Sequence, residues 1–76
     1  MSERLQIIFM QARLVRLAAD KWDTSISKVN SIFAKKNVYH YINNYWGIFH
    51  VEGDNAVLDD IERYIGRRNQ DDQLTN

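Results

Sequence analysis

The stretch from residue 5 to residue 22 is the longest run of helically spaced apolar residues in this 76-residue chain. One stripe recurs at alternating steps of three and four, the spacing of one face of an α-helix: Leu5, Ile8, Ala12, Val15, Ala19 and Trp22. A second stripe, rotated well away from the first, consists of Ile7, Met10, Leu14 and Leu17. This helix therefore has more apolar perimeter than one packing face requires. It either sits centrally in its domain or offers one stripe to a partner.

Apolar residues at helical spacing predict further helices, separated by residues that are typical of turns. The second helix is expected to begin near Ser25 or Ser27 and to end before Asn37. Asparagine tolerates the left-handed backbone conformation that closes many helices. The third helix covers residues 38–46, and Gly47 is expected to stop it.

An extended segment and a fourth helix complete the predicted domain. Residues 48–51 (Ile-Phe-His-Val) predict a short extended stretch, which is too short to make a stable sheet alone. The fourth helix starts after Asp54 or Asn55. We therefore predict an all-α fold, with a single four-helix domain over residues 1–68 and an extended segment between its third and fourth helices. Residues 69–76 contain one apolar residue in eight and are expected to form a disordered tail.

The composition excludes several kinds of site and location. There is no cysteine, so neither a disulfide nor a thiolate metal site is available. No apolar run approaches the ~18 residues of a membrane span, because Gln11, Arg13 and Arg16 interrupt the first helix. The N-terminus lacks the basic stretch, apolar core and cleavage site of a signal peptide. We expect a soluble, cytoplasmic protein without a membrane partner.

The charges cancel over the whole chain but are unevenly distributed. Residues 1–50 carry seven Lys or Arg against three acidic residues, a net charge of +4. Residues 51–76 carry three Arg against seven acidic residues, a net charge of −4. This polarity suits a charged partner, although solvated faces that merely differ in charge explain it equally well.

No set of residues predicts catalysis, a metal site or a cofactor site. His40 and His50 stand ten residues apart, and neither has a histidine at helical i+4 spacing or a cysteine to share a metal. The sequence singles out no nucleophile, base and stabiliser that would act together. We therefore expect a non-enzymatic protein in which both histidines are structural or surface groups.

Aromatic residues crowd into one region, at Tyr39, Tyr41, Tyr45, Trp46 and Phe49. Tyr41 and Tyr45 share the apolar face of the third helix, so core packing explains them. Core packing does not explain Tyr39 and Trp46 in this way, and exposed aromatic residues are favoured anchors at interfaces. The predicted partner-binding surface therefore combines these two aromatics with the second stripe of the first helix: Ile7, Met10, Leu14 and Leu17. Self-association through the same stripe, giving a homodimer, remains open.

The second and third helices, joined by a tight turn, also resemble a helix-turn-helix in outline. In that reading polar side chains of the third helix face base edges and two lysines contact phosphates. These residues are His40, Asn43 and Asn44 for the bases and Lys35 and Lys36 for the phosphates. The third helix contains no Lys or Arg, whereas basic contacts supply most of the affinity for DNA. DNA binding by a transcriptional regulator is therefore the alternative prediction.

A set of mostly apolar positions between residues 26 and 65 carries a family resemblance. They are Val29, Ile32, Phe33, Asn37, Tyr41, Ile42, Phe49, His50, Gly53, Asp60, Ile61, Tyr64 and Ile65. In this pattern the sequence resembles a family of short bacterial proteins of unknown function. The family usually has Gly in place of Asn37 and Leu in place of Phe49. Both differences are mild, since Asn and Gly accept a left-handed backbone and Phe and Leu both fill an apolar pocket.

The resemblance also implies a genetic setting. Proteins of this kind are often encoded beside a larger protein similar to ADP-ribosyltransferases, in an apparent toxin–antitoxin pair. The resemblance therefore implies that the chain is a small antitoxin that binds and neutralises a partner toxin enzyme. An over-apolar first helix and the lack of a catalytic set agree with this expectation, which is drawn from genetic association rather than from a site in the sequence.

Overall fold

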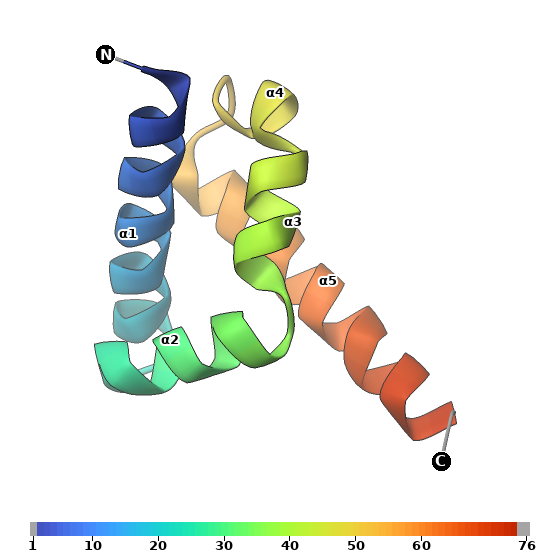
Figure 1. Ribbon diagram of the computed structural model, residues 1–76. Coiled ribbons are helices and arrows are strands. Elements are labelled where there is room, and N and C mark those ends of the chain that lie inside the picture. Colours follow the sequence, from blue (N-terminus) through green and yellow to red (C-terminus); the bar gives the residue numbers. More distant parts are fainter. Residues whose placement is uncertain (1, 75–76) are drawn as a thin grey trace.

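Five helices make up the part of the chain that the computed structural model describes, which is residues 2–74, with side chains described as far as residue 70. They are α1 (Glu3–Lys21), α2 (Ile26–Lys35), α3 (Val38–Asn44), α4 (Trp46–Phe49) and α5 (Asp54–Leu74). The all-α prediction is confirmed, but residues 2–74 form five helices rather than the four predicted, because the short α4 is added. In Figure 1, α1 and α3 stand on opposite sides, α2 joins them across one end, and α5 passes diagonally behind. None of the helices in residues 2–74 is long and apolar enough to cross a bilayer.

Side-chain caps and a left-handed residue set the boundaries of the first three helices. Ser2 caps α1 by accepting a hydrogen bond from the backbone N–H of Leu5 at 3.3 Å. Ser25 caps α2 in the same way, accepting from the N–H of Lys28 at 3.0 Å. Asn37 separates α2 from α3 with a φ of 59°, so the predicted left-handed residue is confirmed.

The core is apolar throughout and draws on all five helices. Its largest fully buried side chains are Phe33, Met10, Leu14, Ile42, Leu58, Ile61, Val29, Val38 and Val57. Helix α1 contacts α2, α3 and α5, so it is the central element of the fold, as its apolar perimeter predicts. Because no charged or polar side chain is buried among the described residues, the core is held mainly by burial of apolar surface.

The prediction of an extended segment at residues 48–51 is wrong. Residues 46–49 form the short helix α4, and the chain then turns towards α5. The backbone N–H of Phe49 donates to the carbonyl of Tyr45 at 2.9 Å, and that of His50 donates to Trp46 at 3.0 Å. Burial of Phe49 against Tyr41 holds this turn in place, so tertiary packing overrides the local preference of Ile, Phe and Val for extended backbone.

The last helix also differs from the prediction at its end. It starts at Asp54, as predicted, but continues to Leu74, beyond the end expected at residue 68. The expected tail at residues 69–76 is thus helical as far as Leu74, and its last two residues lie outside the described part of the chain.

Ion pairs between α1 and α5 use part of the uneven charge within the molecule. Arg13 pairs with Asp54 at 3.0 Å, and the Lys21 ammonium pairs with Glu62 at 2.7 Å. The indole N–H of Trp22 donates to the second Glu62 oxygen at 2.8 Å. The hydrogen bond from Lys21 lowers the pKa of the Glu62 carboxyl, because it stabilises the ionised form. The basic N-terminal half thus meets the acidic C-terminal half inside one domain.

Candidate protein-binding surface

The second stripe of α1, which the sequence pattern predicts to bind a partner, faces the core. Met10 is 2% exposed and Leu14 is fully buried, while Ile7 is also buried and Leu17 is half-buried. A partner would have to displace neighbouring helices to reach Met10 or Leu14. The assignment is therefore corrected: this stripe anchors α1 in its own domain, because it packs into the apolar core.

The exposed apolar surface of α1 lies on the opposite side of the helix. We call it the outer stripe, and it consists of Leu5, Ile8, Phe9 and Ala12, all of which are exposed. The exposed fractions of Leu5, Ile8 and Phe9 are 46%, 46% and 48%. These positions follow the i, i+3, i+4, i+7 spacing of a single helical face, so their side chains form one continuous row.

The outer stripe ends where other helices begin to cover α1. Val15 and Ala19 continue the first predicted stripe, yet they are only 7% and 8% exposed. Helix α2 and the start of α3 contact α1 near this level, and the Gln11 amide donates to the Tyr39 carbonyl at 3.1 Å. Figure 1 shows the N-terminal half of α1 extending beyond α2, without a helix in front of it.

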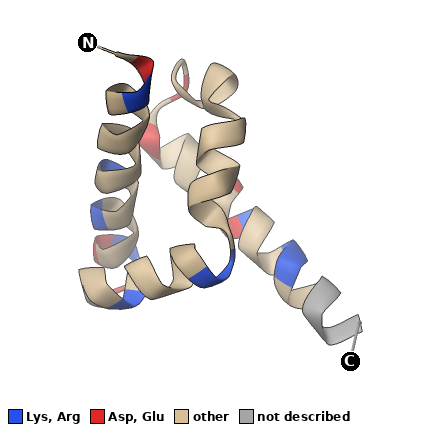
Figure 2. Ribbon diagram, in the orientation of Figure 1, with Lys and Arg blue, Asp and Glu red and all other residues tan. Residues whose placement is uncertain are grey.

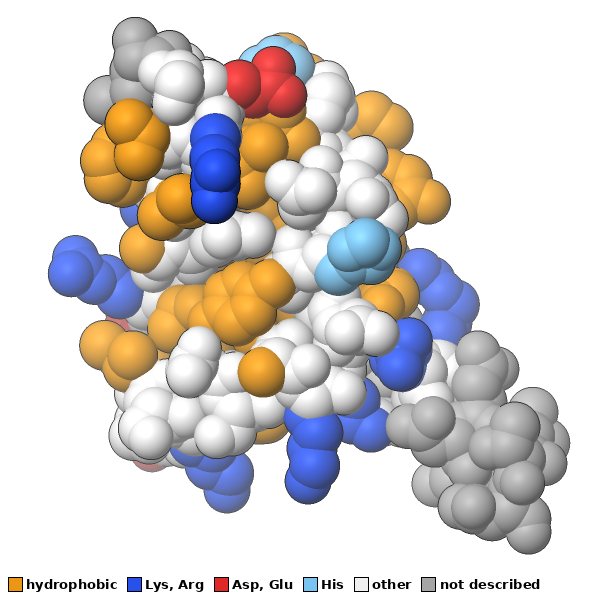
Figure 3. Space-filling model, in the orientation of Figure 1, with side chains coloured by type: hydrophobic (Ala, Val, Ile, Leu, Met, Phe, Trp, Pro, Cys, Tyr) orange, Lys and Arg blue, Asp and Glu red, His pale blue; other side chains and the backbone are white. Residues whose placement is uncertain are grey.

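A cleft of about 470 Å³ adjoins the outer stripe at Ala12. It is lined by Ala12, Val15, Arg16, Ile26, Ser27, Asn30 and Tyr39. Tyr39 forms its inner wall, with its hydroxyl donating to the Asn30 side chain at 2.6 Å and its ring edge-on to Phe33. Partial burial raises the pKa of the Tyr39 hydroxyl. Figure 3 shows hydrophobic side chains at the surface over α1 and between α1 and α3.

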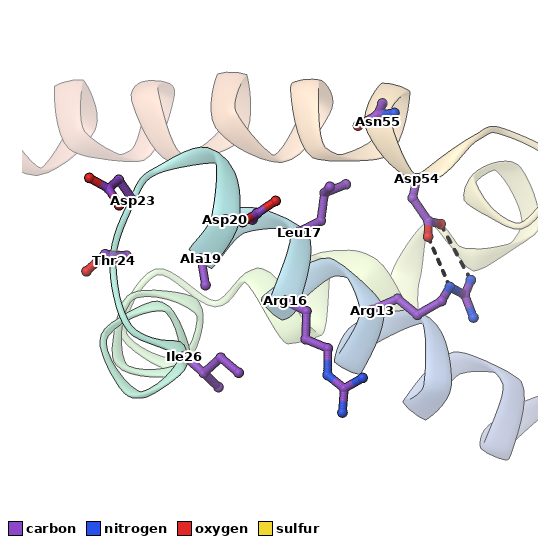
Figure 4. Close-up of a pocket in the computed structure, with 10 residues that line it drawn as sticks. All are labelled: Arg13, Arg16, Leu17, Ala19, Asp20, Asp23, Thr24, Ile26, Asp54 and Asn55. Carbon is purple, nitrogen blue, oxygen red and sulfur yellow. Dashed lines mark hydrogen bonds and ion pairs between the residues drawn. The ribbon is translucent and has the colours of Figure 1, made fainter.

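A second hollow lies around the end of α1 and the beginning of α5, and it contains Leu17. Figure 4 shows its lining residues, which come from α1, the turn at residues 23–24, α2 and the first turn of α5. The Arg13 side chain reaches Asp54, whereas that of Arg16 extends without a partner among the residues drawn. This hollow is rich in charged groups, and Leu17, which is half-buried in it, packs against the apolar core.

Tyr39 and Trp46, which were predicted to belong to one partner-binding surface, lie in different places. Tyr39 lines the cleft beside the outer stripe, but Trp46 lines a separate cleft of about 520 Å³ between the start of α1 and α4. Trp46 stacks on His50 with ring centroids 5.1 Å apart, and the His50 Nδ1 lies 2.8 Å from the Trp46 carbonyl. Trp46 is therefore half-buried by its own neighbours and does not extend the surface around Tyr39.

The residues of the alternative DNA-binding reading do share one region. His40, Asn43 and Asn44 are exposed on α3, and the Asn44 amide lies 3.1 Å from the His40 Nε2. Lys35 is exposed and Lys36 half-buried at the preceding turn. Helix α3 spans only seven residues, so the polar face that it presents is short and carries no formal positive charge.

Two residues of this surface lie outside both of the stripes that the sequence predicts. Phe9 belongs to neither predicted stripe, although its i+4 relation to Leu5 indicates that the two share a face. Ile26, at the start of α2, is 55% exposed at the mouth of the cleft. In the described part of the chain, no three His, Asp or Glu side chains converge closely enough to hold a metal ion.

Comparison with known proteins places the chain in a family. The model of a family described as "Protein of unknown function (DUF3791)" matches residues 9–68. The chain belongs to this family. No curated protein and no solved structure matches it. The DUF3791 region includes all residues that line the cleft beside the outer stripe, whereas Leu5 and Ile8 lie just before it.

Proposed function

We propose that this DUF3791 protein is a non-enzymatic protein-binding module that holds its partner on the outer stripe and the adjoining cleft. One observation carries the proposal: three large apolar side chains, each about half exposed, stand in a row on the central helix. Single exposed apolar residues are ordinary on protein surfaces, but a contiguous row beside a cleft is typical of an interface. Burying such a row provides the apolar centre from which most interfaces gain their affinity.

The partner that we propose is a toxin enzyme similar to ADP-ribosyltransferases, and the protein would act as its antitoxin. The family resemblance, with the genetic setting that it implies, supports this choice of partner. In this role the chain needs a rigid surface that occludes the enzyme, and α1 supplies one because its other side is fixed in the core.

Co-expression with the product of the neighbouring open reading frame tests the proposal. We expect the two proteins to copurify, and we expect the small protein to relieve the growth defect that its neighbour causes. Ile8→Gln should reduce capture about tenfold or more, because it places an amide in the apolar row. The matched control is Val51→Gln, since Val51 is 76% exposed and lies after α4. If Ile8→Gln captures the neighbour as well as the natural sequence does, the outer stripe is not the binding surface.

A second candidate function is DNA binding through α3. The observation that favours it is the exposed group of His40, Asn43 and Asn44, next to a turn that has the left-handed Asn37. This function predicts salt-sensitive binding to the promoter of the protein's own gene pair, weakened by Asn43→Ala and Lys36→Ala. Absence of binding at low salt would remove this candidate.

A further inference from the structure

Basic side chains accompany the outer stripe along α1. Arg4 lies at its start, Arg16 lies at its end beside the cleft, and Arg13 is held by Asp54. Arg4 and Arg16 are exposed and make no ion pair with any residue that the structure describes. Figure 2 shows these basic positions spread along α1, with acidic positions only near its two ends. The uncovered side of α1 is thus an apolar row bordered by unpaired positive charge.

The shape of this surface suits a helix rather than a strand. Residues 2–74 contain no strand, so there is no sheet edge to which an extended peptide would add. From Leu5 to Arg16 the surface extends about 16 Å along α1, roughly three turns of a partner helix. A helix lying along such a row would place one large apolar side chain into the cleft between Ala12, Ile26 and Tyr39.

A second copy of this chain fits the same surface poorly. In a symmetric dimer the same patch meets itself, so each residue and its counterpart exchange contacts. A parallel pairing of two outer stripes would bring Arg4 to Arg4, and an antiparallel pairing centred near Met10 would bring Arg4 to Arg16. Both arrangements set like charges together at the edge of an apolar contact, which disfavours them.

We infer that the outer stripe and the cleft bind an amphipathic helix of the partner that is acidic along its flanks. This inference rests on the proposed function and narrows it to one class of binding segment. An apolar side chain of that helix fills the cleft, and Asp or Glu residues on either side of its apolar face pair with Arg4 and Arg16. The apolar row supplies affinity, and the arginines select an acidic segment over a basic one.

Synthetic helical peptides test the inference directly. Three peptides of about 15 residues would share one Leu-rich apolar face and carry Glu, Gln or Lys at the flanking positions. By fluorescence anisotropy, we expect the Glu peptide to bind about tenfold or more tightly than the Lys peptide, with a preference that weakens as salt rises. Arg4→Gln with Arg16→Gln should remove this preference, whereas the control Arg63→Gln, on α5, should keep it. Amide NMR shifts should change at residues 5–16 and near Ile26.

Several results would overturn the inference. They are equal binding of the Glu and Lys peptides, no binding of any peptide, and shift changes confined to other helices. Light scattering that shows a dimer dissolved by Ile8→Gln would make a second copy the occupant instead. Suppose that Ile8→Gln abolishes capture of the neighbouring protein but that the double arginine variant captures it normally. The proposed function is then supported, and the inference of an acidic partner helix is wrong. If Ile8→Gln leaves capture intact, the proposed function itself falls, whatever the peptides do.

Discussion

The two halves of α1 carry the same apolar pattern but meet different surroundings. In the N-terminal half, Leu5 and Ile8 are 46% exposed, whereas Val15 and Ala19, farther along the same predicted stripe, are nearly covered. The difference lies in the rest of the chain and not in the stripe, since α2 lies beside the C-terminal half of α1 (Figure 1) and shares a cleft with Val15. Periodicity therefore marks which side of a helix is apolar, and the neighbouring elements decide how much of that side is left for another molecule.

The largest effect should come from the inward side of α1, where Leu14 is completely buried. Leu14→Ala should lower the free energy of unfolding by about 3 kcal/mol, because it leaves a cavity among helices that cannot fully close it. Ile8→Ala, on the outer stripe, should cost less than about 1 kcal/mol, since half of that side chain is already hydrated. Urea unfolding of both variants gives the comparison, and equal losses would mean that the two sides of α1 are not packed differently.

The two halves of the outward side can be compared with a smaller change. Val15→Ala should cost about 1.5 kcal/mol, because Val15 is buried beneath α2 and the start of α3. Ala12→Ser, one turn earlier and exposed, should change the stability by less than about 0.5 kcal/mol. In thermal unfolding, we expect a clear decrease in Tm for Val15→Ala and almost no change in Tm for Ala12→Ser. A similar shift for Ala12→Ser would show that the covered part of α1 begins at least one turn earlier, at Ala12.

The covered half is also fastened to α5 by Glu62, which accepts from Lys21 and Trp22. Glu62→Gln should cost about 1 kcal/mol at neutral pH, because a neutral amide replaces a charged acceptor of both donors. Folding holds the pKa of Glu62 below its ordinary value of 4.5, so the unfolded chain binds this proton more readily than the folded chain does. The stabilisation from this carboxylate is therefore complete above pH 4.5 and is lost as the pH falls through the lower folded pKa.

Unfolding of the natural sequence and of Glu62→Gln, measured between neutral and acidic pH, checks this sign. The difference in stability between the two should shrink as the solution is acidified. A difference that stays constant with pH would show that the carboxylate and Lys21 do not interact in solution.

The smallest effect concerns Asn37, whose left-handed backbone turns the chain so that α3 returns towards α1. Asn37→Gly should raise the stability by up to about 0.5 kcal/mol, because glycine adopts positive φ without steric cost. Asn37→Ala is the control and should lower the stability by about 1 kcal/mol, since alanine is strained in this conformation. Chemical unfolding of the pair tests the sign. If both variants change the stability in the same direction, backbone strain at this position is not the cause.

Much of the fold could be predicted from local signals in the sequence. Caps at Ser2 and Ser25, the left-handed Asn37 and the start of the last helix at Asp54 all depend on residues within a few positions of each other. The prediction for the segment around Phe49 was wrong because its helical turn is stabilised by contacts with Tyr41, which a local pattern does not reveal. The polar composition after residue 68 indicated a tail, whereas the helix continues to Leu74.

The sequence predicted that α1 would leave apolar surface exposed, but not which residues would form that surface. Two stripes on one helix correctly indicated that apolar surface would be left over, and the structure leaves Leu5, Ile8 and Phe9 exposed. The sequence did not reveal which stripe faces inward, because both follow the same helical spacing. That choice depends on how α3 and α5 approach α1, which is set by contacts between residues far apart in the chain.

The most direct test of a binding surface on the N-terminal half of α1 is the double variant Ile8→Gln/Phe9→Gln, with stability and partner capture measured on the same preparation. Because both side chains are about half exposed, we expect the free energy of unfolding to change by less than about 1 kcal/mol. In the same preparation, capture of the neighbouring gene product should be lost. A loss of stability of several kcal/mol would show that the outer stripe is covered within the monomer. Unimpaired capture by a stable variant would show that the partner binds elsewhere.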